Sequence, residues 1–421
     1  MYDVFSIEDF SFPEGFLWGS SYAGHQVEGN NKNNQWWDKE QRGETEEKSG
    51  MACNSYEMYE TDAKLVKELG HQFFRTSVEW CRIEPQPGVF DEKATEHYVR
   101  FFESLKEKGV KVFATLVHFT VPSWFWKEGH FKKRDNLKYF ERYLEYIVPK
   151  IAPYVDIWNV INEFNMGITD EFAQSKCMSI LYHAMGYNII KKYSKSPVSS
   201  AHALVNFMPY RPGDEWDDMA AKYMDMINNE FFFHAIRTGE IVYPQKDVIV
   251  APEVKDTVDF WSVNSYTREM VDSRRADFAG NKYVHKTIKT IGRDFFLNEM
   301  HPECMIGNLY RLKDKPVIIS ENGYSSHDDR FRIVYIALYL SAIKEAMDMG
   351  VDVRGYSYWS LLDNYEWGSY VPTFGICSVD KKTFERTPKL SAYFYRDIIQ
   401  NNGFSQEILR KYLNELPTLK K

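Results

Sequence analysis

Residues 156–163 read DIWNVINE, and residues 317–323 read VIISENG. Each stretch is a short, nearly continuous apolar run that leads into a glutamate. Strands of a parallel sheet have this character, because helices cover both of their faces and leave no side toward water. Six further runs of this kind alternate with longer amphipathic segments, which predicts a chain built of β-then-α units.

The predicted strands follow one another along a chain that no linker rich in Pro, Gly or Ser divides. They are Phe16–Ser20, Phe73–Trp80, Val112–Phe119, Asp156–Asn162, Val198–Val205, Val258–Asn264, Val317–Ser320 and Tyr356–Leu361. Eight such units predict an α/β fold, a single (β/α)8 TIM barrel over residues 1–421 with extended βα loops. In such a barrel the catalytic residues lie at the C-terminal ends of the strands.

Helices fit between these strands, and capping residues indicate where they begin. Asn54 or Ser55 can cap a helix that ends at Gly70. Asp91 can cap a second helix, which Gly109 ends. The alternation of strand and helix is therefore supported by local signals as well as by hydrophobicity.

Composition limits the class of protein. The chain is 44% hydrophobic and 16% aromatic, which excludes a disordered protein, and its net charge of −8 argues against nucleic acid as the main partner. The first residues, MYDVFSIEDF, lack the basic and apolar regions of a signal peptide, and the longest nearly apolar run is too short to span a bilayer. Five scattered cysteines suit a reducing cytosol and indicate neither a zinc site nor a disulfide framework. We therefore expect a cytoplasmic protein without a metal or nucleic-acid partner; membrane association is not indicated, and neither it nor the oligomeric state is predicted.

Two of the residues at predicted strand ends are isolated acids, Glu163 and Glu321. Taken singly, Glu163 could simply begin a helix, and Glu321 could belong to an Asn-Gly turn. Together they form the pair that glycoside hydrolysis requires. One carboxyl group protonates the leaving oxygen, while the other attacks the sugar carbon or activates water.

The sequence resembles glycoside hydrolase family 1, the retaining β-glucosidase and β-galactosidase family with a (β/α)8 barrel. The resemblance extends from residues 12–19, FPEGFLWG, to residues 388–393, PKLSAY. Between them, residues 162–163 (NE) resemble the family's acid/base motif, residues 319–323 (ISENG) its nucleophile motif, and residues 359–367 (WSLLDNYEW) its sugar-binding signature. Several separated motifs in family order make chance a poor explanation.

The resemblance assigns roles to the catalytic pair. Because the family is retaining, Glu321 is expected to be the nucleophile and Glu163 the acid/base. Arg75 matches the family arginine beside the nucleophile, and Tyr266 matches its hydrogen-bonding tyrosine. Asn264 ends the sixth predicted strand beside this tyrosine and is expected to support the site.

Further matches are to residues that bind sugar hydroxyls. By resemblance, Asn162 holds the 2-hydroxyl, and Gln26 and His118 bind the 3- and 4-hydroxyls. A lone histidine on an apolar strand is more often a core residue than a ligand. The position of His118 at a strand end favours the binding role.

The signature near the C-terminus supplies the rest of the expected sugar site. Trp359 would stack on the sugar face, Trp367 would donate its indole N–H, and Glu366 matches the carboxylate that spans O4 and O6. Family members that act on 6-phosphorylated sugars replace this acid, because a carboxylate repels phosphate. The resemblance therefore implies an unphosphorylated sugar.

Some positions depart from the family pattern or have two interpretations. Phe164 stands where the family usually has proline or another aliphatic residue, Ser265 replaces an aromatic residue, and residues 373–375 (TFG) lack the usual arginine. None of these changes removes a catalytic group, but they leave the leaving-group side undefined. Three further tryptophans could line the sugar site or simply pack: Trp36, Trp37 and Trp124.

The sequence thus predicts a retaining, exo-acting β-glycosidase of unphosphorylated β-D-glucosides, with β-galactosides, fucosides and mannosides as further candidate substrates. The expected partner is a small β-glycoside or oligosaccharide, and the resemblance implies no cofactor. Two alternatives stay open: transglycosylation to an alcohol as the physiological role, and a non-catalytic sugar-binding paralogue, which the presence of both carboxylates disfavours. A metal-dependent isomerase would need clustered His, Asp and Glu ligands at strand ends, which the sequence lacks.

Overall fold

The computed structural model describes residues 3–166, 170–244, 246–275 and 298–418. At its centre is a closed barrel of parallel strands, in which each strand pairs with the next along the chain and the last pairs with the first. The barrel strands are β2 (Leu17–Ser21), β3 (Phe73–Ser77), β4 (Lys111–Val117), β5 (Val155–Asn162), β6 (Val198–Ala203), β10 (Trp261–Asn264), β12 (Val317–Asn322) and β13 (Val353–Trp359). The predicted (β/α)8 barrel is therefore confirmed.

The bounds of the strands differ from those predicted by one to three residues at an end, and the largest differences are in three strands. β3 ends at Ser77, because Trp80 already belongs to the short helix α4 (Trp80–Ile83), and β10 begins only at Trp261. β13 begins at Val353, earlier than its predicted start. The exposed Arg354, which pairs with Asp352, hid that start by interrupting the apolar pattern.

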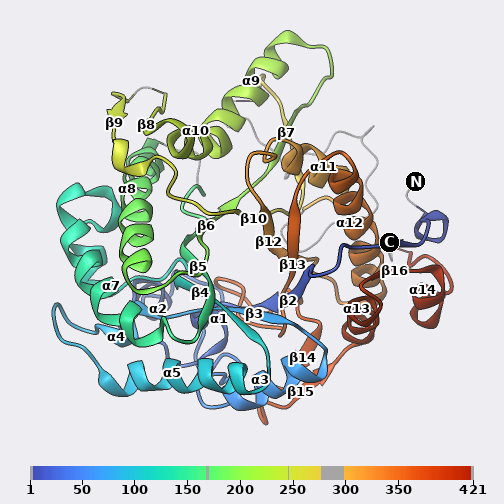
Figure 1. Cartoon of the computed structure of the whole chain (residues 1–421), viewed down its shortest axis with the longest axis horizontal. Helices are drawn as coiled ribbons and strands as arrows, with labels where there is room; N and C mark the ends of the chain where they lie inside the picture. The colour runs from blue at the N-terminus through green and yellow to red at the C-terminus, as the bar shows by residue number, and fades with distance from the viewer. Residues whose placement is uncertain (1–2, 167–169, 245, 276–297, 419–421) are drawn as a thin grey trace.

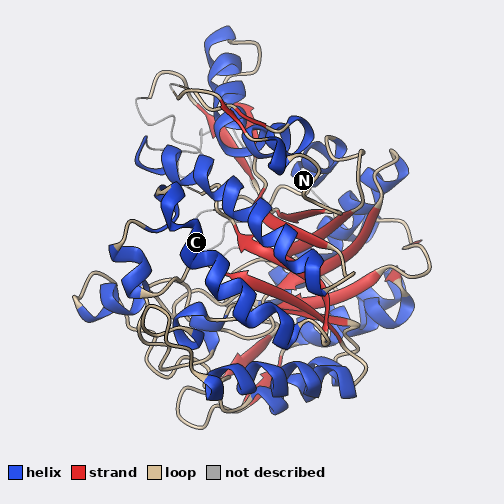
Figure 2. Ribbon diagram, turned by 60° about the vertical axis from the view of Figure 1, so that its left-hand side comes forward, coloured by secondary structure: helices blue, strands red, loops and turns tan. Residues whose placement is uncertain are grey.

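Helices surround the barrel, and the strands lie inside them (Figures 1 and 2). The longer helices are α3 (Tyr59–Glu68), α5 (Glu92–Glu107), α7 (Leu137–Ile151), α8 (Asp170–Tyr193), α9 (Glu215–Asp225), α10 (Phe231–Thr238), α11 (Glu303–Tyr310), α12 (Asp329–Asp348) and α13 (Leu390–Asn401). Shorter ones are α1 (Gly24–Val27), α2 (Gln35–Gln41), α6 (Ser123–Lys127) and α14 (Gln406–Tyr412).

One predicted helix cap is present and the other is wrong. The Asp91 carboxylate accepts a hydrogen bond from the backbone N–H of Ala94 at the start of α5. Helix α3, by contrast, begins at Tyr59 and not after Asn54 or Ser55. Asn54 adopts a left-handed backbone with φ of 54°, which places it in the turn before the helix.

The inside of the barrel is apolar at one end. The side chains of Phe73, Phe113, Ile157, Phe260 and Ile318 form a buried cluster with Leu17 near the N-terminal ends of the strands. Parallel barrels are filled by such layers of side chains and enclose no pore. The glutamates that the sequence singled out lie beyond this apolar layer, at the C-terminal ends of the strands.

The two ends of the chain meet beside the barrel (Figure 1). Strand β1 (Phe10–Ser11) pairs antiparallel with β16 (Gly403–Phe404). The Asn402 side chain strengthens this join, because its Oδ1 accepts from the indole N–H of Trp18 at 2.9 Å and its amide donates to the Phe12 carbonyl at 2.7 Å.

Small two-stranded ribbons form part of the loops around the barrel. They pair β7 (Asn206–Pro209) with β11 (Arg268–Val271), β8 (Glu240–Ile241) with β9 (Ile249–Val250), and β14 (Cys377–Val379) with β15 (Arg386–Pro388). Helix α9 projects from the body of the molecule next to β7 (Figure 1). A π-helical turn at Met226–Glu230 joins α9 to α10.

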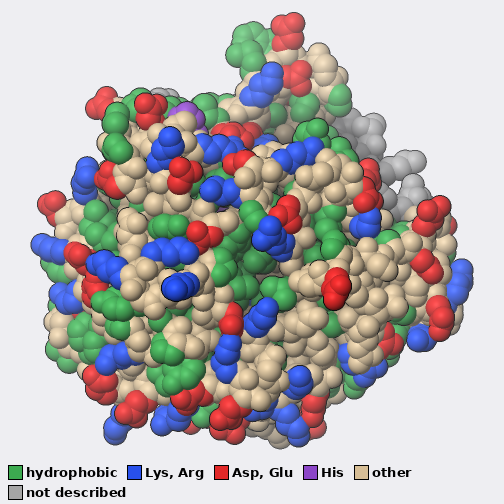
Figure 3. Space-filling model, viewed as in Figure 1, with side chains coloured by type: hydrophobic (Ala, Val, Ile, Leu, Met, Phe, Trp, Pro, Cys, Tyr) green, Lys and Arg blue, Asp and Glu red, His purple; other side chains and the backbone are tan. Residues whose placement is uncertain are grey.

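The visible surface is mixed in charge. On the face seen in Figure 3, Lys and Arg side chains are interspersed with Asp and Glu side chains and do not gather in one patch. None of the helices within the described ranges is both long and apolar enough to cross a bilayer.

Candidate active site

A pocket of about 420 Å³ opens at the C-terminal ends of the barrel strands. It is lined by residues from the loops that follow several strands: His118, Phe119, Glu163, Met166, Ala203, Leu204, Val205, Asn264, Tyr266, Thr267, Glu269, Asn298, Glu321, Trp359, Glu366, Trp367 and Phe374. The two isolated glutamates and the sugar-binding candidates His118, Trp359, Glu366 and Trp367 therefore share one cavity.

Glu321, on β12, is held by two donors. The Arg75 guanidinium donates to one of its carboxylate oxygens, and the Tyr266 hydroxyl donates to the other at 2.8 Å. Arg75 is itself only 1% exposed, so this ion pair is shielded from water. A buried guanidinium and a phenol directed at the two oxygens stabilise negative charge on Glu321 and hold the carboxylate in one orientation.

Glu163 directly follows β5 and has different surroundings. The described contacts include one side-chain hydrogen bond to its carboxyl group, from the Asn264 amide at 2.8 Å. Burial, and secondly the negative charge of Glu321, raise the pKa of Glu163 to about 8. Two carboxyl groups in one pocket with such different surroundings are suited to different roles, one as an acid and one as an anion.

The pH dependence of the reaction should reflect this raised pKa. The acid form of Glu163 is present below pH about 8 and is lost as the pH rises through that value, so we expect kcat/KM for a substrate with a poor leaving group to fall by about tenfold per pH unit above it. Initial rates between pH 4 and 10 measure this limb. A basic limb already centred near the ordinary glutamate range would contradict the assignment.

Asn162, the last residue of β5, connects the two glutamates. Its side-chain oxygen Oδ1 accepts hydrogen bonds from Arg75 at 2.5 Å and from the Asn264 side-chain amide at 3.0 Å. Its own amide group therefore points toward Nε2 of His118, 3.2 Å away. Burial, followed by the charge of Arg75, holds the pKa of His118 well below its usual range, so this ring is neutral and its Nε2 accepts the hydrogen bond.

Glu366 lies at another wall of the pocket, with Trp359 beside it. The indole N–H of Trp359 donates to a Glu366 carboxylate oxygen at 3.2 Å. Burial raises the pKa of Glu366 to about 8 against this hydrogen bond, and the charge of Glu321 adds to the rise. Gln26 and Asn364 also interact with Glu366, and they join each other at 3.0 Å. Gln26 is fully buried and is not among the described lining residues; it contacts the pocket wall through its interaction with Glu366.

Aromatic rings surround Trp367. Its ring is nearly parallel to those of His25, at 5.9 Å, and His118, at 6.1 Å, and it also contacts Trp36 at 5.0 Å. His25 is completely buried, and its Nε2 lies 2.9 Å from Glu40. Trp367 is therefore held by a wall of rings, of which Trp36 is a part.

Trp124, a candidate for the sugar site, lies elsewhere. It packs edge-on against the buried Trp80 at 5.8 Å, and its indole N–H donates to the Glu84 carbonyl. Of the two interpretations of Trp124, packing agrees with these contacts, since Trp124 is not among the described residues that line the pocket. Trp37 is partly buried under Lys32, whose ammonium lies 5.8 Å from its ring centre.

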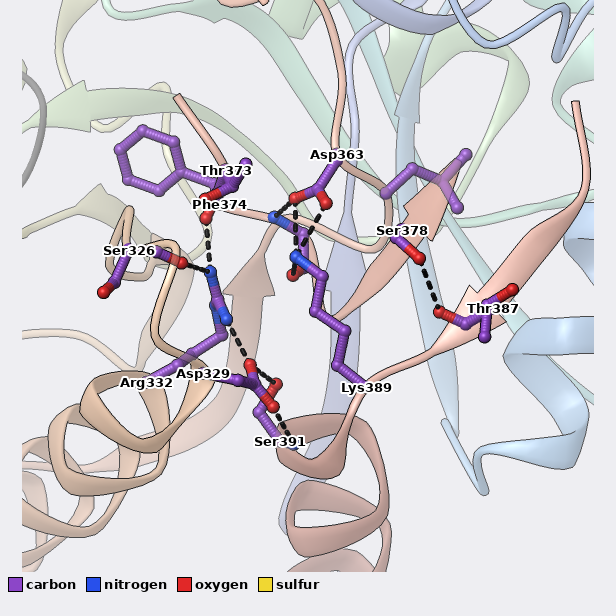
Figure 4. Close-up of polar contacts among 12 residues, drawn as sticks. Ser326, Asp329, Arg332, Asp363, Thr373, Phe374, Ser378, Thr387, Lys389 and Ser391 are labelled. Carbon is purple, nitrogen blue, oxygen red and sulfur yellow. Dashed lines mark hydrogen bonds and ion pairs between the residues drawn. The ribbon is translucent and has the colours of Figure 1, made fainter. Parts of the chain in front are cut away.

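The loop at residues 373–375, which lacks the arginine expected from the resemblance, is held by Arg332. Arg332 of α12, which is completely buried, pairs with Asp329 and donates to the carbonyl oxygens of Ser326 and Thr373 (Figure 4). This anchors the loop beside the next residue, Phe374, which lines the pocket. The Arg332 guanidinium on α12, and not an arginine of the loop itself, thus holds the loop.

The sequence did not indicate the residues on the remaining side of the pocket. These are Met166, Ala203, Leu204, Val205, Thr267, Glu269, Asn298 and Phe374. Most of them follow β5, β6 or β10 within a few residues, so their distance from a strand end is the signal that could have found them. Among the residues that the structure describes, no group of three or more His, Cys, Asp or Glu side chains could hold a metal ion.

Comparison with known proteins gives consistent matches over almost the whole chain. A family model described as Glycosyl hydrolase family 1 matches residues 8–404. Beta-glucosidase A of Acetivibrio thermocellus is 28% identical over 94% of this chain and 99% of its own length. The 6-phospho-beta-galactosidase of Staphylococcus epidermidis is also 28% identical, over 92% of this chain and 98% of its own. The solved structure of a beta-glycosidase from Pyrococcus horikoshii is 32% identical and covers 97% of this chain and 99% of that one, with a TM-score of 0.86.

Proposed function

The chain belongs to glycosyl hydrolase family 1 and is an O-glycoside hydrolase, and from this premise we propose that it is a retaining, exo-acting β-glycosidase of unphosphorylated β-D-glucosides. The observation that carries the proposal is the contrast between two glutamates in one pocket. Glu321 accepts hydrogen bonds from a guanidinium and a phenol, whereas burial and the nearby carboxylate keep Glu163 protonated. The first arrangement suits a nucleophile and the second a general acid.

In the first step, a Glu321 oxygen attacks the anomeric carbon while the bond from that carbon to the leaving oxygen breaks. The Glu163 proton passes to the leaving oxygen, so the aglycone departs as a neutral alcohol. Esterification removes the negative charge of Glu321, which is the second cause of the raised pKa of Glu163. The pKa of Glu163 should therefore fall once the glycosyl-enzyme has formed.

In the second step, Glu163 acts as a base. It takes a proton from a water molecule whose oxygen attacks the anomeric carbon from the side that the aglycone left. The ester bond breaks, and Glu321 regains its charge beside Arg75. Two inversions give net retention of configuration.

The remaining residues of the pocket would bind the sugar. Asn162, whose amide orientation is set by Arg75 and Asn264, would hold the 2-hydroxyl. Trp359 would stack on the sugar, and Glu366 and Trp367 would bind the hydroxyls farthest from the bond that is cleaved. Hydrogen bonds that strengthen as the sugar ring flattens in the transition state would lower the activation free energy of cleavage.

The charge of the pocket favours an unphosphorylated sugar. None of the described residues that line the pocket is Lys or Arg, whereas four are glutamates: Glu163, Glu269, Glu321 and Glu366. Among the described lining residues, a phosphate group would meet no cation to replace its hydration, even where Glu366 is protonated. The proposed substrate thus differs from the one that the name of the 6-phospho-beta-galactosidase relative states.

A panel of 4-nitrophenyl β-glycosides tests the substrate. We expect the glucoside to be cleaved with a kcat/KM at least about 100-fold above that of its 6-phosphorylated form, because the phosphate loses hydration without gaining a cation. The galactoside, fucoside and mannoside, assayed alongside, rank the sugars. Preference for a 6-phosphorylated substrate would refute the proposed substrate class, although not the hydrolase activity.

A further inference from the structure

Asn165, two residues after Glu163, has a side chain that joins several elements. Its Oδ1 accepts from the backbone N–H of Ala203 at 3.0 Å, and its Nδ2 donates to the carbonyl of the same residue at 2.8 Å. Nδ2 also lies 2.9 Å from the Asn228 carbonyl and 3.1 Å from Nε2 of His202. Asn165 is 2% exposed, so these contacts are made out of water. The amide thus joins the loop after β5 to the end of β6 and to a third segment.

That third segment is the π-helical turn at Met226–Glu230. The i→i+5 pattern of such a turn displaces carbonyl groups from regular helical bonding, and π-turns are frequent at functional sites. Here the carbonyl of Ile227 accepts from the ammonium group of Lys176 at 3.0 Å, and the Asn228 side chain accepts from it at 2.9 Å. Lys176 is completely buried. Burial lowers the pKa of Lys176 to about 7, and a buried amino group is costly unless it is hydrogen-bonded, whether it is charged or neutral. This contact is therefore a specific anchor for the turn.

The backbone of Glu163 needs external support. Its φ is 48°, in the left-handed region that glutamate seldom adopts. Such a conformation persists only where the surroundings over-determine it. The Glu163 N–H donates to the Ala201 carbonyl at 2.8 Å, which holds one side of the turn, and Asn165 holds the other.

The residue between them cannot supply the constraint by itself. Phe164 stands where the family usually has proline, and a phenylalanine leaves its own backbone N–H and φ unrestrained. Its ring instead packs edge-on against Phe232 of α10 at 5.1 Å. Ring packing and the Asn165 amide therefore both join this loop to the segment that contains the π-turn.

We propose that Asn165 is a positioning residue for the acid/base Glu163, anchored through the π-helical turn to Lys176. The inference rests on the proposed role of Glu163. Asn165 touches no reacting atom; it sets the height and direction of the carboxyl group that must meet the leaving oxygen. Small displacements of a proton donor weaken proton transfer strongly, so the effect should be largest where the leaving group most needs a proton.

The test compares two aryl β-glycosides of the best sugar from the panel, one with a 2,4-dinitrophenyl leaving group and one with a 4-methylphenyl leaving group. For Asn165→Ala we expect kcat/KM to fall at least about 30-fold on the 4-methylphenyl substrate and less than about threefold on the dinitrophenyl substrate, which departs without protonation. The loss should be in kcat for the first step, with KM little changed.

A matched control removes a similar amide elsewhere. The buried Asn136 donates to the carbonyls of Glu128 and His130 at 3.1 and 3.0 Å and lies outside the pocket lining. Asn136→Ala should change both substrates by the same small factor. Lys176→Met removes the anchor while leaving Asn165 in place. Its kcat/KM should also fall more on the 4-methylphenyl substrate than on the dinitrophenyl substrate, by a smaller factor than in Asn165→Ala. It is the deciding variant if Asn165→Ala does not fold.

Glu163→Gln, assayed in parallel, distinguishes a failure of the positioning role of Asn165 from a failure of the acid/base role of Glu163. If Glu163→Gln discriminates between the leaving groups and both Asn165→Ala and Lys176→Met do not, Asn165 is a structural residue only and the inference is overturned, while the proposed function stands. If Glu163→Gln does not discriminate either, the acid/base assignment itself fails.

Discussion

Glu321→Gln is expected to lower kcat/KM by on the order of 10⁴-fold or more, about 5.4 kcal/mol of activation free energy, on every substrate of the panel. The carboxamide keeps the size of the side chain but has no negative charge to attack the anomeric carbon. Because the covalent intermediate can then no longer form, a good leaving group should not relieve the defect. Steady-state rates with the dinitrophenyl and 4-methylphenyl substrates measure both points.

Trapping of the intermediate identifies the nucleophile directly. A 2-deoxy-2-fluoro β-glycoside with an activated leaving group should inactivate the wild-type enzyme, and peptide mass mapping should place the sugar on Glu321. Glu163→Gln is the matched control, since it changes a carboxyl group of the same pocket and should still be labelled at Glu321. An adduct on any other residue would show that the nucleophile has been assigned wrongly.

Glu163→Ala should have the second largest effect and a different pattern. We expect a loss of about 10²- to 10⁴-fold on the 4-methylphenyl substrate and a much smaller loss in the first step for the dinitrophenyl substrate, because only the former needs the proton. The space left by the side chain should admit azide. Added azide should then raise the turnover of the dinitrophenyl substrate and yield a β-glycosyl azide.

The configuration of that product gives a further check. A β-azide from a β-glycoside means two displacements at the anomeric carbon, as the retaining mechanism requires. An α-azide would mean a single displacement and would contradict the mechanism even if the rate effect were as expected. Glu163→Gln, which leaves less room, should be rescued less.

Most of the barrel could be predicted because parallel strands carry their signal locally. A run such as Val317–Ser320 must be apolar on both faces, so a few consecutive residues are enough to indicate the strand. The two glutamates could be found for the same reason, since each directly follows or ends such a run. The capping prediction at Asn54 failed because asparagine is favoured both at helix caps and at left-handed turn positions, and here Asn54 has the left-handed backbone of a turn.

Contacts between distant segments could not be predicted in this way. The orientation of Trp124 depends on Trp80, which lies on a different βα loop, and no periodicity in either segment records the pairing. The Asn165 contact with the π-turn joins residues 63 positions apart. A π-turn has no composition of its own, and its sequence, MINNE, looks like an ordinary polar piece of helix.

The way in which the ends of the chain meet bears on how the enzyme is made. β2, the first barrel strand, must wait for β13, the last, before the sheet closes, and Gln26 reaches its partner Asn364 across 338 residues. Synthesis delivers the N-terminal half first. A nascent chain that already contains Glu163 and Glu321 therefore lacks Trp359, Glu366 and the strand that seals the barrel, so a truncated product released by premature termination would be inert. We therefore expect activity only after the ribosome has released the segment that contains β13, Glu366 and Trp367.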